Sequence, residues 1–199
     1  NCIVMHLGNG SSLSCTKNGK CLDTSMGLTP LEGMIMGTRC GTLDPAIVPF
    51  IMKKKGFTPE EMDTLMNKKS GLQALCGSAD MRDVHKEREH GNKRAELAFR
   101  MLVHGIKKIL GSYFFLLGGK VDAVTFTAGI GEHDELVRAA VMEGLEGIGF
   151  KLDPEANRAR KSGARAISAP DSRIPILVIP TNEELQIAET AVEVVSKNK

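Results

Sequence analysis

Apolar and polar positions alternate in blocks along the chain, and the first blocks predict strands. An apolar run at Cys2–Leu7 precedes two alternating segments, Ser11–Lys17 and Lys20–Thr24, which are separated by Asn18 and Gly19. Asn-Gly is a strong signal for a two-residue hairpin turn because both residues tolerate positive φ. The start of the chain therefore predicts a strand followed by a β-hairpin.

Two helix-start signals follow a Gly-rich segment, 25–41, that has no clear period. Asp44 is expected to be an N-cap with Pro45 at the first helical position. Thr58 and Glu61 have the spacing of a capping box, which predicts the start of a second helix. A short turn is expected at Ser70 and a polar loop at residues 77–83.

The rest of the chain alternates between helix and strand. Apolar residues recur every three or four positions over residues 92–117 and predict the longest helix, ended by Gly118 and Gly119. The elements expected after it are a strand at 121–127, a tight loop at 128–132, a helix at 134–145, a strand at 174–180 and a helix at 181–195. This order predicts an α/β fold with a mixed β-sheet flanked by helices, in a single domain over residues 1–199.

Composition is that of an ordinary globular protein. The 199 residues are 42% hydrophobic and 25% charged, with a formal net charge of +2. A length of this order buries enough surface for a core without metal or disulfide support, which excludes the mini-protein and disordered classes. The small net charge argues against nucleic-acid or membrane partners. With no long apolar stretch and no signal-peptide pattern at the start, we expect a cytoplasmic protein.

The cysteines and three histidines show no ligand spacing. The five cysteines form no C-x-x-C pair, and free, buried thiols are expected. Cys15 and Cys21 flank the hairpin turn and could lie close together, but in a reducing compartment they would remain thiols. His85, His90 and His104 lie among charged residues, where solvated side chains are expected.

Two Gly-rich turns follow predicted strands and suit a phosphate ligand. Residues 6–12 read HLGNGSS and residues 128–133 read AGIGEH. Glycine lets main-chain N–H groups approach phosphate oxygens, and a helix start after a strand favours anions. Each turn taken alone is also typical of a plain hairpin or βα connection, and residues 6–12 match neither the Walker A motif nor the dinucleotide fingerprint. Two such turns in one domain favour a nucleotide.

Three other positions carry charge that phosphoryl transfer can use. Arg39 lies in a glycine-bounded segment from which a guanidinium could meet a phosphoryl group, and residues 80–82 could contact sugar or base. Thr181 and Glu184 have capping-box spacing, which leaves Glu183 free to reach Mg²⁺ directly or through water. The alternatives are a surface arginine, an ordinary loop and a glutamate that complements the helix dipole.

Taken together, these motifs resemble the C-terminal half of the acetokinase family. The matching segments are HLGNGSS at 6–12, DTSMGLTPLEG at 23–33, GTR at 37–39, LDP at 43–45, FTAGIGE at 126–132 and IPTNEE at 179–184. The resemblance implies the actin-like ATPase fold shared by sugar kinases, Hsp70 and actin. It also implies acetate kinase activity, in which ATP and acetate give acetyl phosphate and ADP.

The resemblance also assigns roles to individual residues. It places ATP contacts at His6, Leu7, Gly8, Asn9, Gly10, Asp80, Met81, Arg82, Gly129, Ile130, Gly131, Glu132 and His133, a transition-state arginine at Arg39, and a glutamate linked to Mg²⁺, or to Mn²⁺, at Glu183. Members of the family are longer and are homodimers, and they carry further site residues in an N-terminal domain. We therefore expect this chain to be the ATP-binding half, with little or no activity alone.

Other functions remain open at this point. The same fold could act on propionate or butyrate, because the acyl pocket depends largely on the half that is missing here. A stand-alone dimerisation or nucleotide-binding module without activity is an alternative of a different class. A dinucleotide-dependent oxidoreductase is disfavoured because residue 13 is leucine where the fingerprint needs its third glycine or alanine.

Overall fold

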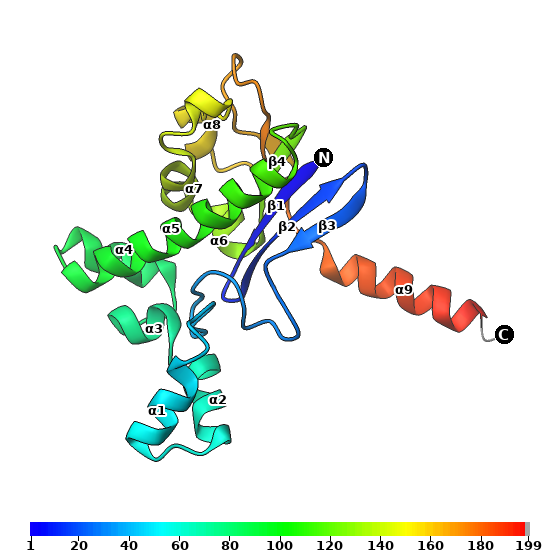
Figure 1. Cartoon of the computed structure of the whole chain (residues 1–199). Coiled ribbons are helices and arrows are strands. Elements are labelled where there is room, and N and C mark those ends of the chain that lie inside the picture. Colours follow the sequence, from blue (N-terminus) through cyan, green and yellow to red (C-terminus); the bar gives the residue numbers. More distant parts are fainter. Residues whose placement is uncertain (198–199) are drawn as a thin grey trace.

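The computed structural model describes residues 1–197 and forms one α/β body from which the last helix projects (Figure 1). Its strands are β1 (Cys2–Leu7), β2 (Ser11–Lys17), β3 (Lys20–Thr24), β4 (Ala123–Thr127), β5 (Arg165–Ala166) and β6 (Ile176–Val178). Its helices are α1 (Ile47–Lys55), α2 (Pro59–Lys68), α3 (Gly71–Cys76), α4 (Met81–Glu89), α5 (Lys93–Leu116), α6 (Ala128–His133), α7 (Glu135–Met142), the 3-10 helix η1 (Glu146–Ile148), α8 (Pro154–Arg158) and α9 (Glu183–Lys197).

The strands form one mixed sheet, as the sequence predicted, and their order in it is β3-β2-β1-β4-β6-β5. β1, β4 and β6 are parallel neighbours, whereas β2, β3 and β5 join antiparallel. Asn18 and Gly19 have φ of 53° and 76°, which confirms the predicted hairpin turn. In the parallel part of the sheet, β1 and β4 end side by side, with His6 opposite Thr127.

The core lies between this sheet and α5, which crosses β1 and β2. The buried stripe of α5 repeats at helical spacing and consists of Ala95, Ala98, Phe99, Leu102, Ile106, Leu110 and Tyr113. It packs on Ile3, Met5 and Leu7, the alternate residues of β1 that are buried. The predicted long helix is therefore confirmed, with Asn92 as its N-cap.

Two segments expected to be loops are helical. The polar loop predicted up to residue 83 is interrupted at Met81 by α4, because the Asp80 side chain accepts a hydrogen bond from Arg82 N–H and acts as an N-cap. The tight loop predicted at 128–132 is instead the short helix α6, which Ala128 enters with φ of 65°. Both predictions were wrong for one reason: each helix is too short to show an apolar period.

Several element boundaries also differ from the prediction. α1 begins at Ile47, since Asp44 and Pro45 form a turn in which Asp44 Oδ1 accepts from Ala46 N–H. The strands expected at 121–127 and 174–180 are shorter, as β4 and β6, and Pro175 directly precedes β6. The two-residue strand β5 was not expected. The capping box at Thr58 and Glu61 is confirmed.

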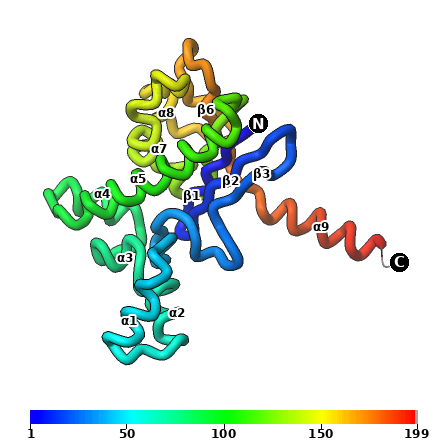
Figure 2. Tube along the Cα trace, viewed as in Figure 1, coloured from blue at the N-terminus to red at the C-terminus, as the bar shows by residue number. Residues whose placement is uncertain are grey.

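The start of α9 shows a different cap from the expected one. Asn182 Oδ1 accepts a hydrogen bond from Leu185 N–H, whereas the Thr181 N–H donates to Glu132 Oε1 at 3.1 Å. The capping box predicted for Thr181 and Glu184 is therefore wrong, and Thr181 instead ties the start of α9 to α6. From there α9 runs away from the sheet (Figure 2).

The cysteines are free, as expected, but only Cys15 is buried and Cys21 is exposed. His90 and His104 are exposed, as expected, whereas His85 is not. Across residues 1–197, no helix combines the length and the apolar character needed to cross a bilayer.

Candidate functional site

A cavity of about 1110 Å³ opens where β1 and β4 end. The turn after β1 contributes Gly8 and Asn9, and α6, which follows β4, contributes Gly129 and Ile130. Because β1 and β4 are parallel neighbours, these two Gly-rich segments meet at one edge of the sheet, the usual place for ligands in α/β folds. The sequence predicted both segments but could not show that they share a cavity.

Arg39 lies directly beside the first Gly-rich turn. Its Nη1 donates to Pro30 O at 3.1 Å, and a Cβ added to Gly10 would lie 2.9 Å from that same nitrogen. Gly37 N–H donates to Asn9 O at 3.1 Å and anchors the Arg39 segment to the turn. The guanidinium can approach this closely only because residue 10 has no side chain.

The same turn is partly closed on itself. Gly8 N–H donates to Gly10 O and to Ser11 Oγ, each at 3.2 Å. Ser11 Oγ in turn donates to Gly8 O at 3.0 Å. The turn is thus held in one conformation by its own hydrogen bonds, which favours a preorganised anion cradle over an extended loop.

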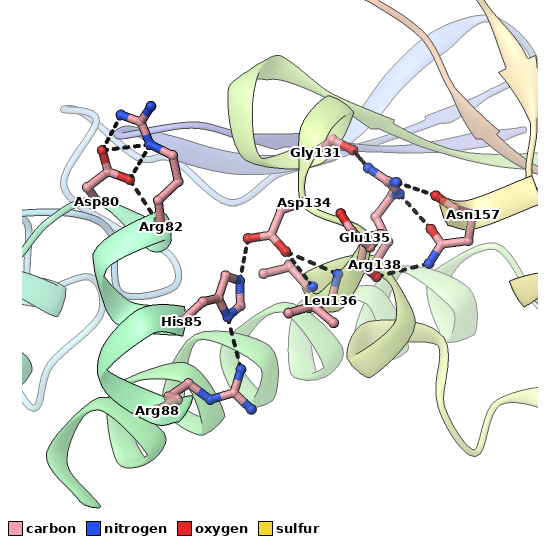
Figure 3. Close-up of polar contacts among 11 residues, drawn as sticks. Asp80, Arg82, His85, Arg88, Gly131, Asp134, Glu135, Leu136, Arg138 and Asn157 are labelled. Carbon is pink, nitrogen blue, oxygen red and sulfur yellow. Dashed lines mark hydrogen bonds and ion pairs between the residues drawn. The ribbon is translucent and has the colours of Figure 1, made fainter. Parts of the chain in front are cut away.

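The opposite part of the cavity is formed by the start of α4, where Asp80 and Arg82 pair with each other. Arg82 Nε donates to both carboxylate oxygens of Asp80, at 3.0 and 3.1 Å (Figure 3). These bonds lower the pKa of Asp80 to about 2. The pair presents a fixed carboxylate and a largely exposed guanidinium at the cavity.

Replacing Arg82 by glutamine is expected to raise the pKa of Asp80 from about 2 toward its ordinary value of 3.8. A lowered folded-state pKa stabilises the fold above the unfolded pKa, and this contribution is lost as the pH falls through the folded value. In the wild type, the contribution of this pair to the free energy of unfolding should therefore fall below about pH 4, and most of it should be lost near pH 2. NMR titration of the Asp80 carboxyl in both proteins measures the shift, and an equally low pKa in the variant would contradict the pairing.

The two glycines of α6 have different surroundings. A Cβ at Gly131 would lie 3.3 Å from the Phe126 carbonyl carbon, which shows that α6 is packed tightly on β4. A Cβ at Gly129 would have no atom within 4 Å and would face the cavity. Gly131 therefore serves packing, whereas Gly129 leaves room for a ligand.

Alanine at Gly131 is expected to lower the free energy of unfolding by about 1–3 kcal/mol, as overpacked sites do. Alanine at Gly129 is the matched control and should leave stability the same or slightly higher, because alanine favours helix. Thermal melts compare them, and at this chain length each kcal/mol corresponds to about 2–4 °C. Equal melting temperatures for the two variants would contradict the packing role of Gly131.

A buried arginine forms the floor of the cavity. Arg138 is 2% exposed, and its guanidinium donates to Asn157 Oδ1, Asn157 O and Gly131 O at 2.8–2.9 Å (Figure 3). Asn157 Nδ2 donates to Glu135 O at 2.9 Å. Burial lowers the pKa of Arg138, yet arginine remains charged at neutral pH. This network joins α6, α7 and α8 around one buried positive charge.

The rim nearest α8 is strongly basic. It is formed by residues 158–165, which include Arg158, Arg160, Lys161 and Arg165. Arg165 Nη2 donates to Glu132 O at 3.3 Å and so contacts α6. Positive charges along a concave wall raise the local concentration of anions.

Sequence reasoning missed both Arg138 and the basic rim, although each leaves a signal. Arg138 lies three and four positions before Val141 and Met142, on the buried face of α7. An arginine on an apolar helix face indicates a buried polar network. The rim appears in the sequence as four basic residues within 158–165.

Comparison with known proteins identifies the family. A family model described as the Acetokinase family matches residues 1–189. The chain belongs to the acetokinase family. An acetate kinase of Desulfovibrio desulfuricans is 71% identical over 195 residues, which are 98% of this chain and 48% of that protein. The chain thus spans about half the length of the curated relatives that it matches.

Solved structures of this family share the fold. The crystal structure of Porphyromonas gingivalis acetate kinase matches with a TM-score of 0.91 and 39% identity, covering 98% of this chain and 49% of that one. A propionate kinase from Francisella tularensis matches with a TM-score of 0.87 and 41% identity, covering 94% and 48%. The actin-like ATPase fold implied by the sequence motifs is confirmed.

The structure brings together most of the residues expected to bind ATP in this acetokinase chain. Those that line the cavity are Gly8, Asn9, Asp80, Met81, Arg82, Gly129, Ile130, Glu132 and His133. The other expected ATP contacts, His6, Leu7, Gly10 and Gly131, are not on its lining. Neither are Arg39, expected to stabilise the transition state, and Glu183, expected to bind the metal ion. The Leu7 side chain is buried in the core, so only its backbone could contact a ligand. Glu183 is exposed at the start of α9.

Proposed function

We propose that this chain is the C-terminal nucleotide-binding half, in one domain over residues 1–199, of an ATP-dependent acetate kinase. The observation that carries the proposal is the cavity shared by the two Gly-rich segments and the start of α4. The relatives that support it are acetate kinases that match 98% of this chain. In this proposal the adenosine lies between residues 80–82 and α6, and the phosphates lie toward Gly8, Asn9 and Gly10.

Phosphoryl transfer requires positioning and charge neutralisation more than covalent chemistry by the protein. The turn at residues 8–10 would supply the main-chain N–H groups of Asn9 and Gly10, because the Gly8 N–H donates within the turn. Arg39 beside it would supply a guanidinium that can contact two phosphoryl oxygens at once. Asp80 and Arg82 hold the sugar and base end. We assign Arg39 the stabilisation of charge on the phosphoryl group as it is transferred to acetate, leaving ADP and acetyl phosphate.

Magnesium fits the residues only in part. Within the described chain, no three His, Cys, Asp or Glu side chains form a metal-binding group. Mg²⁺ keeps several waters and binds through substrate phosphates with one or two carboxylates, so a single glutamate is compatible with it. Glu183 would hold the ion, with Mn²⁺ as a possible substitute, and the ion would neutralise phosphate charge.

The remaining parts of the proposal concern the whole protein. Its small-molecule partners would be ATP, ADP, acetate and acetyl phosphate, in a cytoplasmic enzyme without nucleic-acid or membrane partners. A homodimer is supported by apolar side chains that α5 leaves exposed, among them Phe115 and Leu116. The chain alone would bind ATP and turn over little or nothing, because half of the relatives' length lies outside it.

A propionate kinase is the second candidate, since a protein of that name matches this chain with a TM-score of 0.87. The test is the ratio of kcat/KM for acetate to that for propionate. It is measured on a full-length protein, in which this chain is joined to the other half that the relatives contain. ATP-dependent acyl phosphate, trapped as hydroxamate, is the readout. A higher value for acetate supports the first proposal, a higher value for propionate supports the second, and no acyl phosphate with either acid contradicts both.

A further inference from the structure

His85 lies on α4, behind the cavity lining, and contacts Asp134 at the junction of α6 and α7. Its Nε2 is 2.7 Å from Asp134 Oδ2, and its Nδ1 is 3.0 Å from Arg88 Nη1 (Figure 3). The side chains of His85 and Asp134 are 15% and 11% exposed. The sequence suggested a solvated histidine, and that expectation was wrong because residue 134 folds back onto α4 from 49 positions away.

The contacts fix how His85 is protonated. An arginine nitrogen can only donate, so Nδ1 must accept from Arg88, and the proton must then be on Nε2, from which it is donated to Asp134. Arg88 itself cannot turn away, because its Nε donates to Glu96 at 2.8 Å and its guanidinium lies 3.6 Å from the centre of the Phe99 ring. His85 is therefore held as the neutral Nε2–H tautomer.

Asp134 divides its two oxygens between two tasks. Oδ1 accepts from Leu136 and Val137 N–H and caps α7, whereas Oδ2 accepts from His85. Asp134 also lines the cavity, directly after α6. The bond from His85 consequently joins α4, which carries Asp80 and Arg82, to the junction of α6 and α7.

We propose that His85 is a positioning residue for the nucleotide: its bond to Asp134 sets the spacing between the two cavity walls that would enclose the adenosine. This inference rests on the proposed function, since it assumes that ATP occupies the cavity. It adds a residue outside the cavity lining that controls ATP affinity, and it assigns that residue a defined tautomer.

The test compares the ATP Kd of the 199-residue chain among four proteins. His85→Phe keeps a ring beside Phe99 but loses both hydrogen bonds. It should weaken ATP binding about tenfold, which is the effect of losing one such bond. His85→Gln restores an N–H donor toward Asp134 and an oxygen acceptor toward Arg88, and should recover most of the affinity. His90→Phe, at an exposed histidine next to α4, is the matched control and should bind as the wild type does.

A purely structural role predicts a different result. His85→Phe would then lower the melting temperature while the folded fraction bound ATP with unchanged Kd, and this outcome would overturn the inference alone. Nitrogen shifts of His85 that place the proton on Nδ1 would also overturn it. A wild-type chain that binds no ATP would instead contradict the proposed function, and with it this inference.

Asp134→Asn provides a second variant, which separates the capping of α7 from the hydrogen bond to His85. An amide can keep its oxygen at the Oδ1 position for α7, but its NH₂ would then face the Nε2–H donor of His85. The variant should therefore retain α7 and lose ATP affinity about as much as His85→Phe does. Unchanged ATP affinity in this variant, with α7 intact, would contradict a role of the His85–Asp134 bond in ATP binding.

Discussion

Alanine in place of Arg39 is expected to lower kcat by about 10³-fold while the KM for ATP changes little, because a guanidinium that contacts the transferring phosphoryl group acts mainly in the transition state. The structural basis is the position of Arg39 Nη1 against the Cα of Gly10, in the turn assigned to the phosphates. Steady-state kinetics of the whole enzyme give both constants. Arg100→Ala is the matched control, since Arg100 is exposed and, among residues 1–197, forms an ion pair only with Glu96 on its own helix.

Gly10→Ala offers an independent test of the same geometry. The new methyl group would lie 2.9 Å from the Arg39 guanidinium nitrogen and would push it aside, while the backbone at residue 10 needs no positive φ. We expect a lowered kcat with a nearly unchanged melting temperature. An unchanged kcat in Arg39→Ala would remove Arg39 from the reaction, whatever Gly10→Ala does.

Leucine in place of Asn157 is expected to lower the free energy of unfolding by about 3 kcal/mol, because hydrogen bonds to buried charges are worth more than neutral ones. The substitution removes the Oδ1 acceptor of Arg138 and the Asn157 Nδ2 donor to Glu135 O. At about 2–4 °C per kcal/mol, the melting temperature should fall by about 6–12 °C.

The double variant Asn157→Leu with Arg138→Met distinguishes this cause from simple loss of packing. With the charge gone, the leucine no longer leaves a buried cation short of acceptors, so the double variant should be more stable than Asn157→Leu alone. Additive losses in the two substitutions would contradict the account of a buried charge held by Asn157.

The sequence predicted the elements whose signals are local and strong. The hairpin at Asn18 and Gly19, the capping box at Thr58 and the apolar stripe of α5 are all confirmed. Short elements were not predicted, because α4 and α6 have too few apolar residues for a period to be visible. At the start of α9 the expected cap was replaced by a tertiary bond, since Thr181 donates to Glu132 instead.

The candidate site was predictable only in its turns. Residues 8–10 and 128–133 show their glycines in the sequence, whereas residues 80–82 stand out only as a polar segment that could contact sugar or base. The network of Arg138 with Asn157 and the bond between His85 and Asp134 join residues 19 and 49 positions apart. Such pairs arise when helices pack around the sheet, and no pattern within a single segment encodes them.

The central claim is that this chain holds a nucleotide site of its own, and a thermal melt with ATP tests it most directly. At about 100 times Kd, a ligand adds about 2.7 kcal/mol, which at this length corresponds to a rise of about 5–11 °C. We expect that rise for ATP, and a larger rise with Mg²⁺ than without it. Pyrophosphate, which lacks adenosine, should give a smaller rise. No rise at saturating ATP, or an equal rise with pyrophosphate, would contradict the claim.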